Sequence, residues 1–354
     1  MAALEFRTVE VLALLWGHGP AQPGLFPLFI SMLRVGFPAA LLPELLREFP
    51  EGIELIPVSD KMDHDVEIDV WIPDPYATRA MRAWPHLRGV RLVLSMLAGT
   101  EWIPGLVGPD VTICNAHNAH NVPTAEWVLA AILAMLKQFP LFLDIQRSGN
   151  WRRRNEACEV YAAITGDGRP HHPQVMMEDL SGKTVLIVGY GAIGKEIERM
   201  LAPFHVEVMR VARSARENPT VHAVSDLDSL LPRAEIVVLI LPHTPESHHI
   251  MGRDQLARMR QGALLVNAGR GALVDTDALI EALNAGRIRA ALDVTDPEPL
   301  PEGHPLWSCP NLLITPHIGA STPNFAGNAL RVVVAELRRY MNGEPLQNVV
   351  QAAT

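Results

Sequence analysis

The sequence predicts an α/β protein of two domains built on parallel sheets. Three observations lead to this prediction. Short uncharged runs typical of buried strands alternate with amphipathic stretches along most of the chain. A strand, a glycine-rich turn and an amphipathic stretch follow one another at Thr184–Arg199. The chain has 354 residues, 48% hydrophobic and 19% charged, which is enough for two domains that each bury a core.

The glycine-rich turn lies in the segment TVLIVGYGAIGKEIER. Thr184–Val188 is a β-branched and aliphatic run without charge, which predicts a strand buried on both faces of a parallel sheet. Gly189, Gly191 and Gly194 follow at the spacing that permits a tight bend, the approach of a pyrophosphate and close packing of helix on strand. A helix starting near Ala192 would direct its amides and its positive dipole end at the phosphates. We therefore predict a dinucleotide site, with a purely structural turn as the alternative.

The composition excludes several classes of protein. Lys and Arg number 30 against 39 Asp and Glu, a formal charge of −9 without a basic stripe, so we expect no nucleic-acid partner. Cys114, Cys158 and Cys309 are too few and too scattered for a disulfide framework or a zinc site, so we expect a cytoplasmic location and no metal. No apolar run is long enough to span a bilayer, and Val9–Trp16, with Glu5 before it, fits a buried strand better than a signal peptide.

The first part of the chain predicts an open α/β sheet. Ala21–Pro38 carries three prolines and predicts an irregular loop with one or two helical turns. Leu97–Pro104, LAGTEWIP, is a small-residue turn after a strand, where open α/β folds bind ligands, and an ordinary loop is the alternative. The expected strands are Val9–Leu15, Ile53–Pro57, Val66–Trp71 and Arg91–Met96, and the expected helices are Ala39–Glu48 and Arg79–His86.

A polar cluster and a long apolar helix come next. Asn115–Asn121, NAHNAHN, has no third ligand at matching spacing, so we interpret it as a hinge or cleft loop rather than a metal site. Thr124 is the predicted N-cap of a helix over Ala125–Phe139, which is apolar nearly all round and must be buried in its domain or against a second subunit. Pro140 should end or kink this helix before a second helical stretch, Leu141–Gly149.

The second half predicts the six strands of a full dinucleotide-binding sheet. Ile164–Pro173, with two glycines and two prolines, predicts an exposed loop before the first of them, and Gly343–Thr354 a tail. The expected strands are Thr184–Val188, Val206–Val211, Glu235–Leu241, Ala263–Asn267, Ala290–Val294 and Leu312–Thr315, and the expected helices are Leu227–Leu231, Arg253–Met259, Thr276–Ala285 and Leu330–Tyr340.

The end of the second strand bears on which dinucleotide is bound. An acidic residue about 20 positions after the glycines usually holds the ribose hydroxyls and repels a 2′-phosphate. Ala212 stands at that place, and Arg213, Ser214 and Arg216 follow it. Guanidinium and hydroxyl groups can pair with a phosphate, so the sequence favours NADP, with NAD as the alternative. Arg213 could instead stack on the adenine.

Three polar residues follow strands of the second half: Arg270 in NAGRG, Glu298 in DVTDPEP and His317 in TPHIGAST. The carboxyl ends of parallel strands share one edge, so these side chains could converge. Histidine can protonate a developing alkoxide, a carboxylate on its second ring nitrogen raises its pKa, and a guanidinium can hold a substrate carboxylate and polarise a carbonyl. The three types suit interconversion of a carbonyl and an alcohol. Taken singly, each could be an ordinary surface or loop residue.

The motifs GYGAIG, LPHTPES, VNAGRGALVD, LDVTDPEPLP and TPHIGAS resemble, in this order, the D-isomer-specific 2-hydroxyacid dehydrogenases, in particular the glyoxylate/hydroxypyruvate reductases. The resemblance implies a Rossmann dinucleotide-binding domain at 115–319, inserted into a flavodoxin-like substrate domain formed by 1–114 and 320–354. It also implies that Arg270 binds the substrate carboxylate and carbonyl, that His317 is the acid/base with Glu298 as its partner, and that the helix after Thr124 lies in a homodimer interface. LAGTEW departs from the usual substrate loop.

By the same resemblance, the reaction is hydride transfer between the nicotinamide and C2 of a small 2-hydroxy or 2-keto acid. The alternatives are a dinucleotide-sensing, corepressor-like binding protein and a phosphite- or formate-type dehydrogenase. The expected substrate-binding residues are Leu97, Ala98, Gly99, Arg270 and His317. The expected cofactor-binding residues are Gly189, Tyr190, Gly191, Ala192, Ile193, Gly194, Arg213, Ser214, Arg216, Pro242, Thr244, Ala268, Gly269, Arg270, Asp293 and His317.

Overall fold

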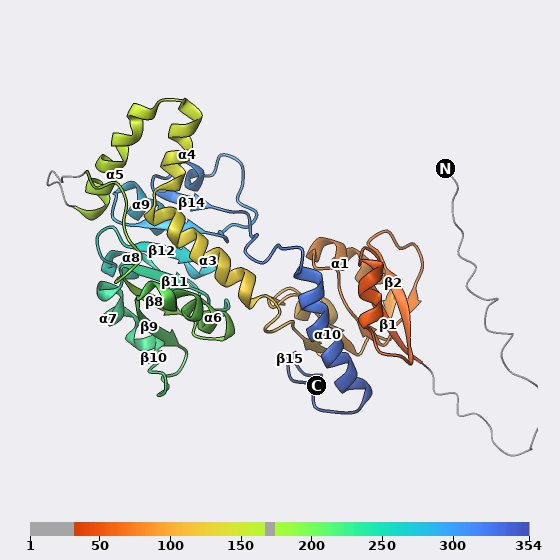
Figure 1. Ribbon diagram of the computed structural model, residues 1–354. Helices are drawn as coiled ribbons and strands as arrows, with labels where there is room; N and C mark the ends of the chain where they lie inside the picture. The colour runs from red at the N-terminus through yellow and green to blue at the C-terminus, as the bar shows by residue number, and fades with distance from the viewer. Residues whose placement is uncertain (1–31, 167–173, 354) are drawn as a thin grey trace, which may run out of the picture.

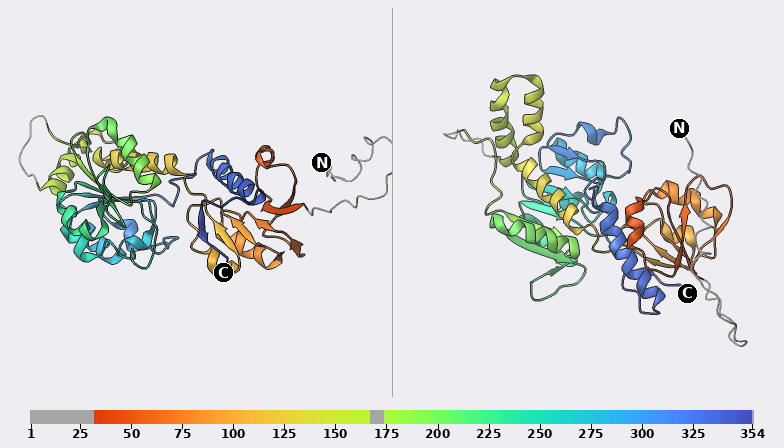
Figure 2. Two further views of the ribbon diagram at one scale, coloured as in Figure 1. Left: turned by 90° about the horizontal axis from the view of Figure 1, so that it is seen from below. Right: turned by 45° about the vertical axis from the view of Figure 1, so that its right-hand side comes forward.

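The computed structural model of the protein describes residues 32–166 and 174–353. These residues form two α/β units, each built on its own sheet, which lie side by side (Figures 1 and 2). The predicted strand Val9–Leu15 and most of the predicted loop Ile164–Pro173 lie outside the described residues. The α/β class with parallel sheets is confirmed.

The first sheet has the strand order β15-β7-β6-β4-β1-β2. Its five consecutive parallel strands, β2-β1-β4-β6-β7, follow the flavodoxin-like order 2-1-3-4-5. β15 is antiparallel to β7. A separate pair joins β3 to β5. The strands are β1 (Leu33–Pro38), β2 (Ile53–Val58), β3 (Val66–Glu67), β4 (Val70–Trp71), β5 (Leu87–Arg88), β6 (Leu92–Leu94), β7 (Thr112–Cys114) and β15 (Val349–Gln351).

Several expectations for this unit were wrong. Leu33–Pro38, expected in an irregular loop, is strand β1, because Val35 is fully buried between β2 and β4 and the proline falls at the last strand position. Val66–Trp71 is not one strand: it divides into β3 and β4, which pair in different sheets. Gly343–Thr354 is not only a tail, because β15 pairs with β7 there.

Short helices and one long helix cover the first sheet. The predicted helix Ala39–Glu48 is a 3-10 helix that starts only at Pro43, where a missing N–H costs nothing. Ala329, Leu330 and Val333 of the long helix α10 pack with strand residues in one apolar core, so the end of the chain returns to the first unit (Figure 1). The helices are η1 (Pro43–Glu48), α1 (Ala77–Ala83), η2 (Trp84–His86), α2 (Ile103–Val107) and α10 (Phe325–Met341).

The second sheet is parallel throughout, in the order β10-β9-β8-β11-β12-β13-β14. This is the dinucleotide-binding order 3-2-1-4-5-6 with one further strand at the end. The six predicted strands are present, and the two-residue edge strand β10 was not foreseen. The strands are β8 (Thr184–Val188), β9 (Glu207–Ala212), β10 (His222–Ala223), β11 (Ile236–Leu239), β12 (Leu264–Asn267), β13 (Arg289–Leu292) and β14 (Leu312–Ile314).

Helices cover both faces of the second sheet. One face packs against α3 and α6, and the other against α7, α8 and α9. Strand residues 185–188 and 236–239 are at most 1% exposed, which explains their uncharged sequences. The helices are α6 (Ala192–Leu201), η4 (Ala202–Phe204), η5 (Val224–Asp226), α7 (Leu227–Leu230), η6 (Leu231–Arg233), α8 (Arg253–Arg258), η7 (Gly271–Leu273), α9 (Thr276–Asn284) and η8 (Pro305–Ser308).

The helix α3 (Asn121–Leu136) leads from the first unit into the second (Figure 1). Thr124 is not its N-cap: the helix begins at Asn121, because Pro123 is tolerated in a first turn, and Thr124 is buried inside it. As predicted, the helix ends before Pro140, which lies in the first turn of α4 (Phe139–Ser148). The two helices meet at an angle of 62°. η3 (Trp151–Asn155) and α5 (Glu156–Thr165) follow α4.

Among the described residues, no single helix has the length and apolar character needed to cross a membrane, and only the bent pair α3 and α4, taken together, meets that criterion.

Candidate active site

The glycine turn between β8 and α6 is shaped as a phosphate cradle. A Cβ on Gly189, whose φ is +111°, would lie 2.6 Å from the Ile240 carbonyl, and one on Gly194 would lie 2.5 Å from the Gly189 oxygen. These two glycines therefore allow the turn to pack on β11 and α6 to pack on β8. A Cβ on Gly191 would meet no described atom within 4 Å. Gly191 is the N-cap of α6 and supplies no side-chain acceptor, so the first-turn amides of Ala192 and its neighbours can serve a pyrophosphate.

Tyr190 anchors the turn to the neighbouring strand. Its hydroxyl hydrogen-bonds to Glu198 at 2.5 Å, and Glu198 is also ion-paired with Arg210. Burial and the Glu198 carboxylate raise the pKa of Tyr190. Arg216 donates to the Tyr190 carbonyl at 2.9 Å, and its guanidinium lies 5.8 Å from the ring centre. Arg216 therefore sits against the glycine turn.

Cationic and hydroxyl side chains follow the end of β9. Ala212 is the last strand residue, and no carboxylate stands at that position. Arg213 and Ser214 follow it and are exposed to solvent, as is Arg216. The Arg213 charge contributes to lowering the pKa of Glu246, after the larger effects of hydrogen bonds from Glu246's own backbone and from Thr244.

The predicted catalytic residues follow three neighbouring strands, β12, β13 and β14. His317 Nδ1 lies 2.5 Å from Glu298 Oε1, so the predicted pair is formed. The hydrogen bond to Glu298 raises the pKa of His317, against the opposing effects of burial and of the Arg270 charge. Arg270 follows the neighbouring strand β12, and its side chain is paired with Glu101.

Asp293 holds the loop that carries His317. Its carboxylate accepts hydrogen bonds from the amides of Ile318 at 2.9 Å and Gly319 at 2.7 Å, and from the hydroxyl of Thr315 at 2.6 Å. The His317 amide donates to the Asp293 carbonyl at 2.7 Å. His317 itself has a φ of +53°, which these bonds support. We predicted Asp293 as a cofactor residue; in the structure its carboxylate binds this loop.

Arg270 contacts the predicted substrate loop of the first unit. Its Nε donates to Glu101 Oε1 at 3.1 Å and its Nη1 to the Gly269 carbonyl at 2.7 Å. A Cβ on Gly99 would lie 1.7 Å from Arg270 Nη2, so the guanidinium rests directly on the Gly99 backbone. We did not predict Glu101. The available indication was an acid two residues after the glycine of LAGTEW.

The remaining substrate-loop residues are tied to the segment between the units. The Leu97 amide donates to Ser95 Oγ at 3.0 Å, and the Leu97 carbonyl accepts from the Ala116 amide at 2.9 Å. Asn115 Nδ2 donates to the Ala98 carbonyl at 2.9 Å. The Leu97 amide is therefore already engaged within its own loop.

The other predicted cofactor residues lie in turns at the same sheet edge. After β11, Ser247 Oγ accepts from the Thr244 amide at 2.8 Å and donates to the Pro242 carbonyl at 2.9 Å. After β12, the Ala268 amide donates to Leu239 and the Gly269 amide to Asn267 Oδ1, both at 3.1 Å. These turns therefore hold their backbone in a fixed shape beside the glycine cradle.

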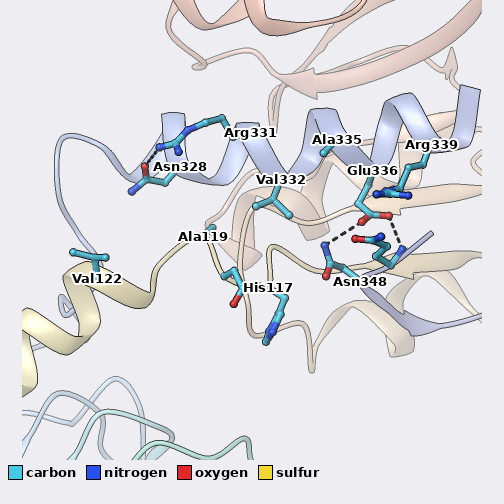
Figure 3. A pocket seen from close by; sticks show the side chains of 12 residues that line it. His117, Ala119, Val122, Asn328, Arg331, Val332, Ala335, Glu336, Arg339 and Asn348 are labelled. Atoms are coloured by element: carbon cyan, nitrogen blue, oxygen red, sulfur yellow. Dashed lines mark hydrogen bonds between the residues drawn. The ribbon is translucent and has the colours of Figure 1, made fainter. Parts of the chain in front are cut away.

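The NAHNAHN segment joins the last strand of the first unit to α3. His120 is buried, lies 3.0 Å from the Met96 carbonyl and stacks on Phe325, and burial lowers its pKa. His117 lines a cavity of about 600 Å³ beside α10 (Figure 3). Arg270, Glu298 and His317 are not among the residues that line it. Across residues 32–166 and 174–353, no group of three or more His, Cys, Asp or Glu is placed to hold a metal ion.

The cradle, the parallel sheet and the His–Glu pair define a dinucleotide-dependent dehydrogenase. The model of the D-isomer specific 2-hydroxyacid dehydrogenase NAD binding domain matches residues 129–319. The chain belongs to this family, whose members are NAD(P)-dependent oxidoreductases acting on a CH–OH group. The prediction of the family and that of a nicotinamide dinucleotide cofactor are confirmed.

Individual relatives agree with this assignment. Glyoxylate/hydroxypyruvate reductase B of Escherichia fergusonii is 40% identical over 262 residues, which cover 69% of this chain and 75% of that protein. D-3-phosphoglycerate dehydrogenase of Methanocaldococcus jannaschii is 32% identical over 246 residues, 68% of this chain, but the match spans only 43% of that protein. The structure of an NADPH-dependent glyoxylate/hydroxypyruvate reductase of Sinorhizobium meliloti, in complex with NADP and sulfate, is 25% identical with a TM-score of 0.73, covering 90% of this chain and 98% of that one.

Proposed function

We propose that the protein reduces a small 2-keto acid, such as glyoxylate or hydroxypyruvate, with NADPH. The observation that carries the proposal is the pair of His317 and Glu298, 2.5 Å apart, after strands that neighbour the one followed by Arg270. Proton donor, carboxylate partner and guanidinium are the three groups that reduction of a 2-keto acid requires.

Each residue has a separate task in this proposal. Arg270 and the amides of Ala98 and Gly99 bind the substrate carboxylate, and the guanidinium polarises the C2 carbonyl. Reduced nicotinamide supplies the hydride that reaches C2. The Nε2 proton of His317 passes to the substrate oxygen, and Glu298 stabilises the imidazolium before this transfer. Because Glu298 raises the pKa of His317, more of the imidazole is protonated at neutral pH, as the direction of reduction requires.

The preference for NADP rests on the end of β9. An alanine stands where an acid would bind the ribose hydroxyls, and Arg213, Ser214 and Arg216 follow it and are exposed. A 2′-phosphate can accept hydrogen bonds from all three side chains. A similar solved protein, the Sinorhizobium meliloti reductase, holds NADP.

We also propose a cytoplasmic homodimer that buries the arm formed by α3, α4 and η3. Phe139, Leu143 and Trp151 of this arm are more than half exposed, which is costly for a monomer in water. Light scattering on the purified protein should give twice the chain mass. The division into a dinucleotide domain at 115–319 and a substrate domain from the rest accords with the two sheets and with α10 packing on the first of them.

The test is an activity panel. Purified protein is mixed with NADPH or NADH and with glyoxylate, hydroxypyruvate and pyruvate, and loss of nicotinamide absorbance is followed. Phosphite and formate with NADP are run in the opposite direction. We expect reduction of at least one keto acid, faster with NADPH. Binding of NADPH without turnover of any acid would contradict the proposal and favour a dinucleotide-sensing binding protein, while turnover of phosphite or formate alone would point to that class of dehydrogenase.

A further inference from the structure

The carboxylate of Glu101 is paired with the guanidinium of Arg270, to which the proposed substrate would bind. Glu101 comes from the loop after β6 in the first unit, and Arg270 follows β12 in the second. Their Oε1 and Nε atoms are 3.1 Å apart, and the pair joins residues 169 positions apart in the chain. This contact is part of neither sheet and connects the two units at the site of the chemistry.

The neighbouring contacts leave little room for a second carboxylate. Arg270 Nη1 is bonded to the Gly269 carbonyl, and Nη2 rests on Gly99. The second oxygen of Glu101 also lies close to Gly99, 3.0 Å from the position a Cβ would take there. The carboxylate of Glu101, the guanidinium and the loop backbone therefore occupy the same small volume.

We infer that Glu101 is a specificity-determining residue, which holds Arg270 until the substrate carboxylate replaces it and which disfavours 2-keto acids that carry a second anionic group. A monoanion replaces one carboxylate by another at the same guanidinium. A dianion brings a further negative charge near Glu101, which remains tethered to the loop, and like charges at this distance repel. The site would thus select small 2-keto acids with one carboxylate. This inference rests on the proposed function.

Because water reaches both side chains of the pair, replacing Glu101 by a substrate carboxylate at Arg270 should cost little free energy. The side chains of Arg270 and Glu101 are 31% and 48% exposed. Ion pairs with this access to water contribute little to folding, so Glu101 can leave Arg270 without unfolding the loop. Replacing the carboxylate by an amide of the same shape should therefore change binding rather than stability.

The kinetic test compares Glu101→Gln with Glu54→Gln, an exposed glutamate on β2 of the same unit. With glyoxylate, Glu101→Gln should lower KM about two- to fivefold with kcat changed less, since an exposed ion pair no longer competes. With oxaloacetate, a dianion, kcat/KM should rise about tenfold. Glu54→Gln should match the wild type on both acids. An unchanged or higher KM for glyoxylate, or equal gains for both acids, would overturn the inference.

A second measurement does not need turnover. Phenylglyoxal modifies accessible arginines, and mass spectrometry of the Arg270 peptide gives its rate in the whole protein. Glu101→Gln should be modified about threefold faster at Arg270 than the wild type, and Glu54→Gln at the wild-type rate. Equal rates in all three proteins would refute the pairing of Glu101 with Arg270. If the wild type turned over no keto acid, the proposed function would fail, and this measurement would still decide whether Glu101 pairs with Arg270.

Discussion

The cofactor edge and the substrate edge of this protein are built in different ways. At the cofactor edge, Gly189 and Gly194 fit against backbone atoms within 2.6 Å of where their side chains would begin, so the shape is set by the main chain. At the substrate edge, the decisive contact is between two half-exposed side chains, Glu101 and Arg270, from different units. Changes at the first edge should therefore act through folding and the shape of the cradle, whereas changes at the second should act in graded steps through charge.

Substitution of His317 should have the greatest effect on activity and leave cofactor binding nearly unchanged. His317→Ala removes the proposed proton donor, so kcat should fall roughly 10³-fold. The affinity for NADPH, measured by fluorescence titration, should stay within about twofold, because the pyrophosphate and the adenosine half of the dinucleotide would bind away from His317. A parallel loss of NADPH binding would mean that His317 mainly supports the cofactor.

The cofactor edge can be tested with two matched glycine variants. Gly189→Ala should lower the free energy of unfolding by about 2–3 kcal/mol, because its Cβ would overlap the Ile240 carbonyl and its φ is +111°. Gly191→Ala should melt close to the wild type, because its Cβ meets no described atom within 4 Å, yet bind NADPH about tenfold more weakly. Thermal melts and fluorescence titration provide the two measurements. Equal losses of stability would show that Gly191 also has a packing role.

A smaller effect is expected at the ribose end. Arg213→Ala should lower kcat/KM for NADPH about tenfold while changing that for NADH less than about twofold, since only the phosphate loses a partner. Arg233→Ala, the same change of charge at an exposed site of the second unit, is the control and should change neither. A loss shared equally by both dinucleotides would indicate that Arg213 stacks on the adenine instead.

The smallest effect is a shift in pH dependence. In the proposed mechanism reduction needs protonated His317, so kcat/KM should fall as the pH rises through its raised pKa. Glu298→Gln removes the main cause of the raised pKa, so the fall should begin at a lower pH. Profiles of both proteins with the same acid check this. A fall at the same pH in both would assign the titration to another group.

The two edges also differ in what their sequences reveal. The strands β8, β11 and β12 were predictable because each is a short run buried on both faces, and the glycine turn because its three roles are local. β1 was missed because its segment of the sequence carries several prolines. The strand nevertheless lies between two others, and its Val35 is fully buried. β7 was not predicted, because its three residues are too few to show the sequence pattern of a strand. The partnership of Glu101 with Arg270 could not be predicted, because it spans 169 positions and depends on how two units meet.

Asp293 gives the active site a different kind of constraint. It is 4% exposed, and both its carboxylate oxygens accept hydrogen bonds from the loop that carries His317. Asp293 takes no part in the proposed transfer of hydride or proton. The two carboxylate oxygens of its short side chain accept all three hydrogen bonds from the loop at once. A substitution at Asp293 should therefore disturb the position of His317 even though Asp293 lies in the core of the domain.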